Sequence, residues 1–221
     1  MVVVERFEIQ EVEKMKKAVL CLILLCVVSS LAFAGMTLGV TGCYHSVGPS
    51  FGMEGEAVGF DVNVQLPVWL YASELIRPTS DTPLTFLDFL SLPLMQVNLY
   101  GRVVRTRVFN LNLGILTSAS AILPYQSPNW AFSVFWGPSM DLSFKVNDRF
   151  SFFVRGSLPA MYLLSWIEDM VNEERAEENK INLAQYGGRV FFSDGNAAGG
   201  LVSSAFTLTS HLAQLGLQFT L

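Results

Sequence analysis

Apolar residues alternate with small or polar residues along most of this chain, and the C-terminus shows the pattern most clearly. There, Leu215, Leu217, Phe219 and Leu221 are separated by Gly216, Gln218 and Thr220. Successive side chains of a β-strand point to opposite faces, so a period of two predicts a strand with one apolar face and one polar face.

The same alternation predicts eight strands. They cover residues 36–47, 56–65, 68–76, 94–104, 108–120, 130–146, 150–158 and 203–221. Gly and Pro mark the breaks, so residues 48–52 are predicted to be a loop, and residues 77–93 and 165–200 are predicted to be longer loops with one or two short helices. Three tight turns then lie at one end and the longer loops at the other. An extra hairpin within residues 186–205 would give ten strands, and this alternative remains open.

Strand parity also predicts which residues face one another. Residues 94–104 and 108–120 both place odd positions on the apolar face, so the turn between them must contain an odd number of residues, as 105–107 does. The same argument places Asp141 opposite Arg155. The predicted inward residues include five charges, which need partners because an unpaired buried ion is costly. This predicted lumen charge network consists of Asp61, Arg102, Asp141, Lys145 and Arg155. It fits either a structural plug, which we favour, or a gated polar channel.

Composition narrows the class of protein. The 221 residues are 51% hydrophobic and 15% charged, with a mean hydropathy of +0.41. No run of 18 or more apolar residues follows residue 34, which argues against a helical membrane protein. Apolar residues spread over short alternating segments are typical of a membrane β-barrel, in which one face of every strand meets lipid.

The N-terminal region has the three parts of a secretory signal peptide in residues 15–34. Lys16 and Lys17 are basic, residues 18–30 are apolar, and Ala32 and Ala34 predict cleavage after Ala34. Residues 1–14 are acidic where a signal should be basic, so we interpret them as a translation-start artefact before the true start at Met15. The barrel domain is then 35–221. Cys43 is its single cysteine, which excludes an internal disulfide. Residues 40–43 match a lipoprotein box poorly, so Cys43 is expected to face into the barrel.

The chain ends on Gln214, Gly216, Phe219 and Leu221, a spacing that resembles the C-terminal assembly signal of bacterial outer-membrane β-barrels. Leu221 stands where a terminal Phe is more usual. Together with the signal peptide and the strand count, this ending makes the chain similar to the small OmpW-like outer-membrane barrels. The transmembrane domain of OmpA is a second architecture that it resembles.

The resemblance implies an all-β fold, an eight-stranded antiparallel transmembrane β-barrel with short periplasmic turns and longer extracellular loops, in the cell outer membrane. Its partners would be outer-membrane lipid, the barrel-assembly machinery and periplasmic chaperones. An OmpW-like protein is further expected to be a narrow passive channel for small hydrophobic solutes, with an apolar pocket at the external end and a lateral exit. Candidate lining residues are Leu116, Val47 and Leu164.

Two other functions stay open from the sequence. A surface-exposed structural barrel with a plugged lumen could bind an extracellular host ligand through its loops, for which the acidic segment 165–185 is the candidate. A soluble periplasmic β-sandwich is the third interpretation. No enzyme is predicted, because His45 and His211 are expected on separate strands and nothing marks a nucleophile. No metal-ligand spacing, cofactor motif or basic patch for nucleic acid is present.

Overall fold

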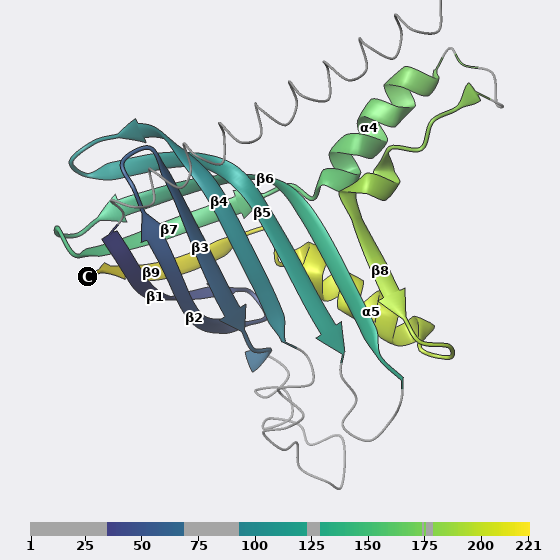
Figure 1. Cartoon of the computed structure of the whole chain (residues 1–221), viewed down its shortest axis with the longest axis horizontal. Coiled ribbons are helices and arrows are strands. Elements are labelled where there is room, and N and C mark those ends of the chain that lie inside the picture. Colours follow the sequence, from purple (N-terminus) through teal and green to yellow (C-terminus); the bar gives the residue numbers. More distant parts are fainter. Residues whose placement is uncertain (1–34, 69–92, 123–128, 174, 176–178) are drawn as a thin grey trace, which may run out of the picture.

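The computed structural model describes residues 35–68, 93–122, 129–173, 175 and 179–221. Eight antiparallel strands form a closed barrel (Figure 1). They are β1 (Gly35–Cys43), β2 (Val47–Glu54), β3 (Val58–Gln65), β4 (Leu94–Arg105), β5 (Phe109–Ile122), β6 (Ala131–Lys145), β7 (Phe150–Ser157) and β9 (Gln214–Thr220). Each strand pairs with its neighbour in the chain, except that β9 pairs with both β7 and β1 and so closes the wall.

The two ends of the barrel differ. The β2–β3, β4–β5 and β6–β7 turns lie at one end, with Gly35 and Thr220, and we call it the turn end. The longer connections lie at the other end, together with the short turn between β1 and β2. The β4–β5 turn consists of residues 106–108, one position beyond the predicted 105–107. The register shifts between Arg102 and Val104, so the predicted parity holds from Leu94 to Arg102 and not up to the turn.

The wall is irregular where β7 ends. β7 pairs with residues 139–145 of β6, and a short extra strand, β8 (Gly188–Phe192), pairs with residues 131–135 of the same strand. Between β7 and β8 the chain forms α4 (Ala160–Asn172) and the 3-10 helix η2 (Ala184–Gly187). α4 projects away from the barrel, whereas α5 (Ala197–Thr209) lies against β5, β6 and β8 (Figure 1).

The barrel is polar inside and apolar outside. Gln65, Gln96 and Asn98 are completely buried in the lumen, whereas Leu99 and Ile115 on the same wall are about half exposed on the outer surface. The predicted alternation of faces is therefore confirmed along β1, β3, β4, β5, β6, β7 and β9. The closed barrel also excludes the β-sandwich, in which apolar faces would pack against a second sheet.

Residues 48–52 are part of β2, so the prediction of a loop there is wrong. Gly and Pro were interpreted as chain breaks, but the glycines serve close strand packing instead. A Cβ atom on Gly48 would lie 1.9 Å from the Val64 carbonyl oxygen, and one on Gly52 would lie 2.7 Å from that of Phe60. The predicted strand 68–76 lies almost wholly outside the described residues, as does the short helix predicted within 77–93.

The predicted closing strand over residues 203–221 is also wrong in its first half, because residues 197–209 form α5 and only 214–220 form β9. The Asn196 side chain caps α5 by accepting a hydrogen bond from the Gly199 amide at 3.2 Å. Ser203, Thr207 and Ser210 then recur at helical spacing on its buried side. The described residues therefore form a barrel of eight strands, the predicted number, and β2 is one of the eight that was not predicted as a strand.

Candidate functional site

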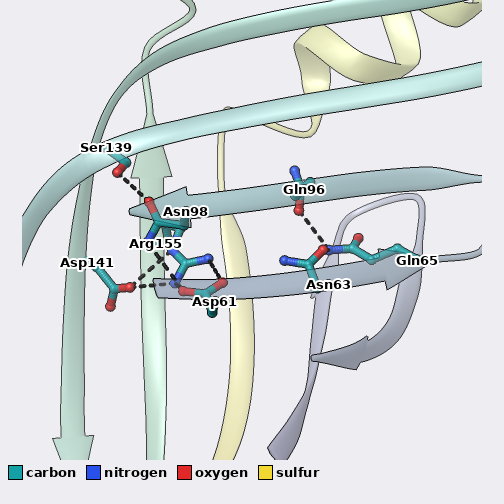
Figure 2. Close-up of polar contacts among 8 residues, drawn as sticks. All are labelled: Asp61, Asn63, Gln65, Gln96, Asn98, Ser139, Asp141 and Arg155. Atoms are coloured by element: carbon teal, nitrogen blue, oxygen red, sulfur yellow. Dashed lines mark hydrogen bonds and ion pairs between the residues drawn. The ribbon is translucent and has the colours of Figure 1, made fainter. Parts of the chain in front are cut away.

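An ion-pair cluster lies in the lumen between β3, β6 and β7. The Arg155 guanidinium binds Asp61 with two parallel hydrogen bonds, Nη1 to Oδ1 at 2.9 Å and Nη2 to Oδ2 at 2.6 Å. It binds Asp141 through Nε and Nη2, at 3.0 Å and 2.7 Å, and both bonds end on Oδ2 (Figure 2). All three residues are at most 6% exposed. The arginine guanidinium is planar and carries several N–H donors. Arg155 on β7 can therefore bind carboxylates from β3 and β6 at the same time and fix the three strands relative to one another.

Neighbouring side chains fix the position of this cluster. The Asn98 side-chain amide lies beside it, 2.8 Å from the Ser139 hydroxyl (Figure 2). The Arg155 guanidinium carbon lies 4.9 Å from the centre of the Phe153 ring, within the range of a cation–π contact. The cluster is therefore held by residues of β4, β6 and β7 as well as by its own ion pairs.

Further toward the end with the longer connections, amide side chains form a second cluster. Gln65 Nε2 donates to Asn63 and to Gln96, each at 2.9 Å (Figure 2), and Gln65 Oε1 accepts from Ser46 at 2.7 Å. Gln96 in turn donates to Ser118 and to Ser210, each at 3.0 Å. This amide cluster links the β1–β2 turn, β3, β4, β5 and the end of α5.

Hydroxyl groups attach α5 to the inner face of the barrel. Thr207 lies 2.7 Å from Ser120 and 2.6 Å from Ser133, measured between side-chain oxygens. Ser203 lies 3.0 Å and 2.8 Å from the same two hydroxyls. The opposite side of α5 is apolar and exposed, with Leu201 and Val202 more than half exposed. α5 therefore behaves as a piece of the wall, polar inward and apolar outward.

The prediction that His45 and His211 lie on separate strands is wrong, because both buried histidines lie in connections between elements. The His45 ring lies in the β1–β2 turn, 3.9 Å from the ring centre of Phe206 on α5. His211 follows α5, and its Nδ1 lies 2.8 Å from the Ser157 hydroxyl. Burial lowers the pKa of each histidine from 6.5 to about 4. Both side chains are therefore neutral at pH 7.

The structure divides the predicted lumen charge network into separate groups. Asp61, Asp141 and Arg155 form the ion-pair cluster, whereas Arg102 pairs with Glu54 nearer the turn end. Lys145 instead lines a cavity of about 230 Å³ at that end. The pairing of Arg102 with Glu54 was not predicted. Glu54 lies between the predicted loop 48–52 and the predicted strand 56–65, so it was assigned to no strand and to no face of the barrel. Strand parity predicts that the amide side chains of the lumen face inward. It could not predict that residues of α5 bind to them and to the inner face of the wall.

Little space remains in the lumen at the ion-pair cluster. The cavity there has a volume of about 10 Å³, which is room for about one water molecule. Leu116 and Leu164 were predicted to line an apolar solute pocket. Leu116 is completely buried on β5, whereas Leu164 lies on α4 and does not line this cavity. The described residues thus show a packed lumen at this level.

A larger apolar groove of about 690 Å³ lies on the outer side of the barrel, where β1 and β9 meet. Its lining includes Val40, Val47, Phe152, Leu215 and Leu217. Cys43 also borders it, at the end of β1, with its sulfur 3.0 Å from the Ser46 hydroxyl. Of the three predicted lining residues, only Val47 belongs to this groove.

The assembly signal predicted at the C-terminus lies on β9 and at its end. Gln214 and Gly216 face the lumen, and Phe219 and Leu221 lie on the exposed side. A Cβ atom on Gly216 would lie 2.2 Å from the Phe153 ring, so packing alone explains a glycine here. The predicted cleavage residues Ala32 and Ala34 lie outside the described residues.

Fold and lumen define the protein as a closed, eight-stranded antiparallel β-barrel with a polar interior. This is the architecture expected of OmpW-like and OmpA-like barrels. Comparison of the sequence with protein-family models and with curated proteins found no match. Within the described ranges, no helix is long and apolar enough to cross a membrane, and no group of three or more potential metal-binding side chains is present.

Proposed function

We propose that this protein is an outer-membrane β-barrel with a plugged lumen, which acts as a rigid structural anchor for surface-exposed segments. The observation that carries the proposal is the inverted distribution of side chains, apolar outward and hydrogen-bonded polar inward. Hydrocarbon offers no partners for backbone groups, and a closed barrel is the arrangement of strands that satisfies them all internally.

The outer surface supports membrane insertion. Large apolar side chains are exposed on all eight strands of the barrel, including Leu38, Phe51, Leu99, Met140, Phe152 and Leu217. In water each Å² of such surface costs about 25 cal/mol relative to an apolar environment, and soluble monomers rarely expose a contiguous apolar area of this kind. The signal peptide predicted at 15–34 and the C-terminal residues support export and delivery to the barrel-assembly machinery by periplasmic chaperones.

The packed lumen supports a plug rather than an open pore. A solute would have to separate Arg155 from two carboxylates and disrupt the amide cluster. Breaking a buried ion pair costs about 3–5 kcal/mol. The hydroxyls that bind α5 to β5 and β6 add a further barrier. No catalytic reaction forms part of this proposal.

The segment best placed for display is α4 with the residues that follow it. Glu168 accepts hydrogen bonds from the Leu183 and Ala184 amides at 2.8 Å and 3.1 Å, and Asn172 bonds with Ile181. These bonds fold the segment back on itself. Tyr162, Trp166 and Met170 are at least half exposed on α4, and aromatic side chains are common in binding surfaces.

Planar-bilayer recording tests the plug. The wild-type protein should give no steady conductance, whereas a variant with Asp61, Asp141, Arg155, Gln65 and Gln96 all replaced by Ala, which removes both clusters from the lumen, should produce conducting channels. A flexible Gly-Ser linker of equal length in place of residues 168–180 should leave the bilayer sealed but abolish binding of an extracellular partner. Steady conductance by the wild-type protein would contradict a plugged lumen.

A second candidate function is lateral passage of small hydrophobic solutes, which the apolar groove beside β1 and β9 favours. Its test is uptake of a small fluorescent hydrocarbon into liposomes that contain the protein. Replacing Val40 by Trp would fill the groove and should slow uptake, whereas replacing Val97 by Trp, on the outer face of β4, should not. Equal uptake by protein-free liposomes would exclude this function.

A further inference from the structure

Asp141 uses only one of its two carboxylate oxygens in the ion-pair cluster. Both bonds from Arg155 end on Oδ2, and no described residue donates a hydrogen bond to Oδ1. Asp61, in contrast, has both oxygens paired with Arg155. Asp141 is only 3% exposed. A buried acceptor without a partner is costly, and more so when it is charged, so Oδ1 has room for a hydrogen-bond donor or a cation.

A second unpaired acceptor lies opposite the first. Asn112 on β5 is the register partner of Asp141, is 3% exposed, and has no donor to its Oδ1 among the described residues. Directly opposite residues of antiparallel strands have Cβ atoms about 4.5–5.5 Å apart. Asp141 Oδ1 and Asn112 Oδ1 can therefore share one ligand between the two strands.

The cavity that both residues line has room for a single small ligand. Asp141, Asn112 and Ser143 all line the cavity of about 10 Å³ at the ion-pair cluster. That volume is about one water-sized sphere. The Ser143 hydroxyl, on the same face of β6 as Asp141, supplies a third oxygen.

The charges around this cavity favour a cation over water. With Asp61 and Asp141 both deprotonated, the two carboxylates and the Arg155 guanidinium leave an excess of one negative charge. Glu54, which also lines the cavity, is already paired with Arg102. Lys145 lines the neighbouring cavity at the turn end, which shares Glu54 and Ser143 with this one. One monovalent cation would neutralise the excess.

We propose that Asp141 Oδ1, Asn112 Oδ1 and the Ser143 hydroxyl bind a small monovalent cation, for which sodium is the probe. Oxygen atoms of carboxylate, amide and hydroxyl groups are the ligands that hard cations prefer. The site is a structural one, buried within the barrel, and goes beyond the proposed function. The cation site can exist whether or not the barrel lies in a membrane, and whether or not the rest of the lumen is blocked.

Equilibrium unfolding of the purified protein in detergent micelles tests the site. Sodium chloride is exchanged stepwise for N-methylglucamine chloride at constant ionic strength, so that screening stays the same. Because a ligand that binds only the folded state stabilises it by mass action, the unfolding constant should fall by up to tenfold for each tenfold rise in sodium above its dissociation constant.

Variants on two strands locate the effect. Asn112→Ala removes one ligand, leaves Arg155 and both carboxylates in place, and should abolish the dependence on sodium. Thr41→Val, on β1, is the control, since Thr41 is also buried with an unpaired side-chain oxygen but lines neither this cavity nor the one at the turn end. It should keep the full dependence. Asn112→Asp adds a charged ligand and should lower the sodium concentration at half effect.

Three results would overturn the proposal. The first is a wild-type unfolding constant that is equal in sodium and in N-methylglucamine, which would mean that water or a proton on Asp141 satisfies these oxygens. The second is an equal loss of the sodium effect in Thr41→Val and Asn112→Ala. The third is an Asn112→Asp variant that folds and responds to sodium no more tightly than the wild type.

Discussion

Arg155 and Asp141 face each other across β6 and β7, with Nη2 of the guanidinium 2.7 Å from Oδ2 of the carboxylate. The same guanidinium binds Asp61 on β3, so it connects strands on different parts of the wall. A single arginine thus neutralises carboxylates that would otherwise repel each other in a lumen shielded from water.

Replacing Arg155 by Met should therefore destabilise the barrel strongly. The change leaves two buried carboxylates without their cation, and we expect a loss of about 3–5 kcal/mol in the free energy of unfolding. Equilibrium denaturation in detergent micelles measures it. Arg149→Met is the matched control, because Arg149 is exposed in the β6–β7 turn and should change stability by less than about 1 kcal/mol. Equal effects of the two changes would refute the structural role of the cluster.

Acidification should weaken the contact between His45 and α5. The pKa of His45 is about 4 in the folded protein and 6.5 without burial, so the unfolded state binds more protons between these values. The stability that neutral His45 contributes is fully present above pH 6.5 and is lost as pH falls toward 4. Replacing His45 by Gln should flatten the decrease in unfolding free energy over this range, as measured by denaturation at several pH values. An unchanged pH profile in the variant would contradict this assignment.

Gly216 should not tolerate a side chain while Phe153 is present. A Cβ atom at Gly216 would lie 2.2 Å from the Phe153 ring, so Gly216→Ala should cost about 1–3 kcal/mol through overpacking. Gly156→Ala is the matched control, since its nearest contact would be an ordinary 3.7 Å.

The double variant Gly216→Ala with Phe153→Leu separates packing from an assembly role for this glycine. If packing is the cause, the smaller side chain at position 153 should recover part of the lost unfolding free energy, so that the two changes are non-additive. Additive losses would show that the clash with Phe153 is not the reason for glycine at this position.

The period-two alternation predicted the faces of seven strands and the register of Asp141 with Arg155, because facing residues must share a side of the wall. β2 was missed because its glycines and Pro49 look like a loop, whereas Gly48 in fact accommodates the backbone of β3. The sequence alone could therefore identify the polar strand residues that face the lumen. The part played by α5 could not, since Ser203 and Thr207 meet Ser120 and Ser133 only through contacts between residues far apart in the chain.

The measurement that tests the central claim most directly is the effect of an outward-facing charge on unfolding in lipid bilayers. Leu99 lies near the middle of β4 and is 45% exposed, and Val108 lies in the β4–β5 turn. If the outer surface contacts acyl chains, Leu99→Arg should cost about 2–4 kcal/mol and Val108→Arg about 0–1 kcal/mol. If Leu99→Arg leaves the free energy of unfolding unchanged, the outer surface faces water and the barrel does not span a membrane.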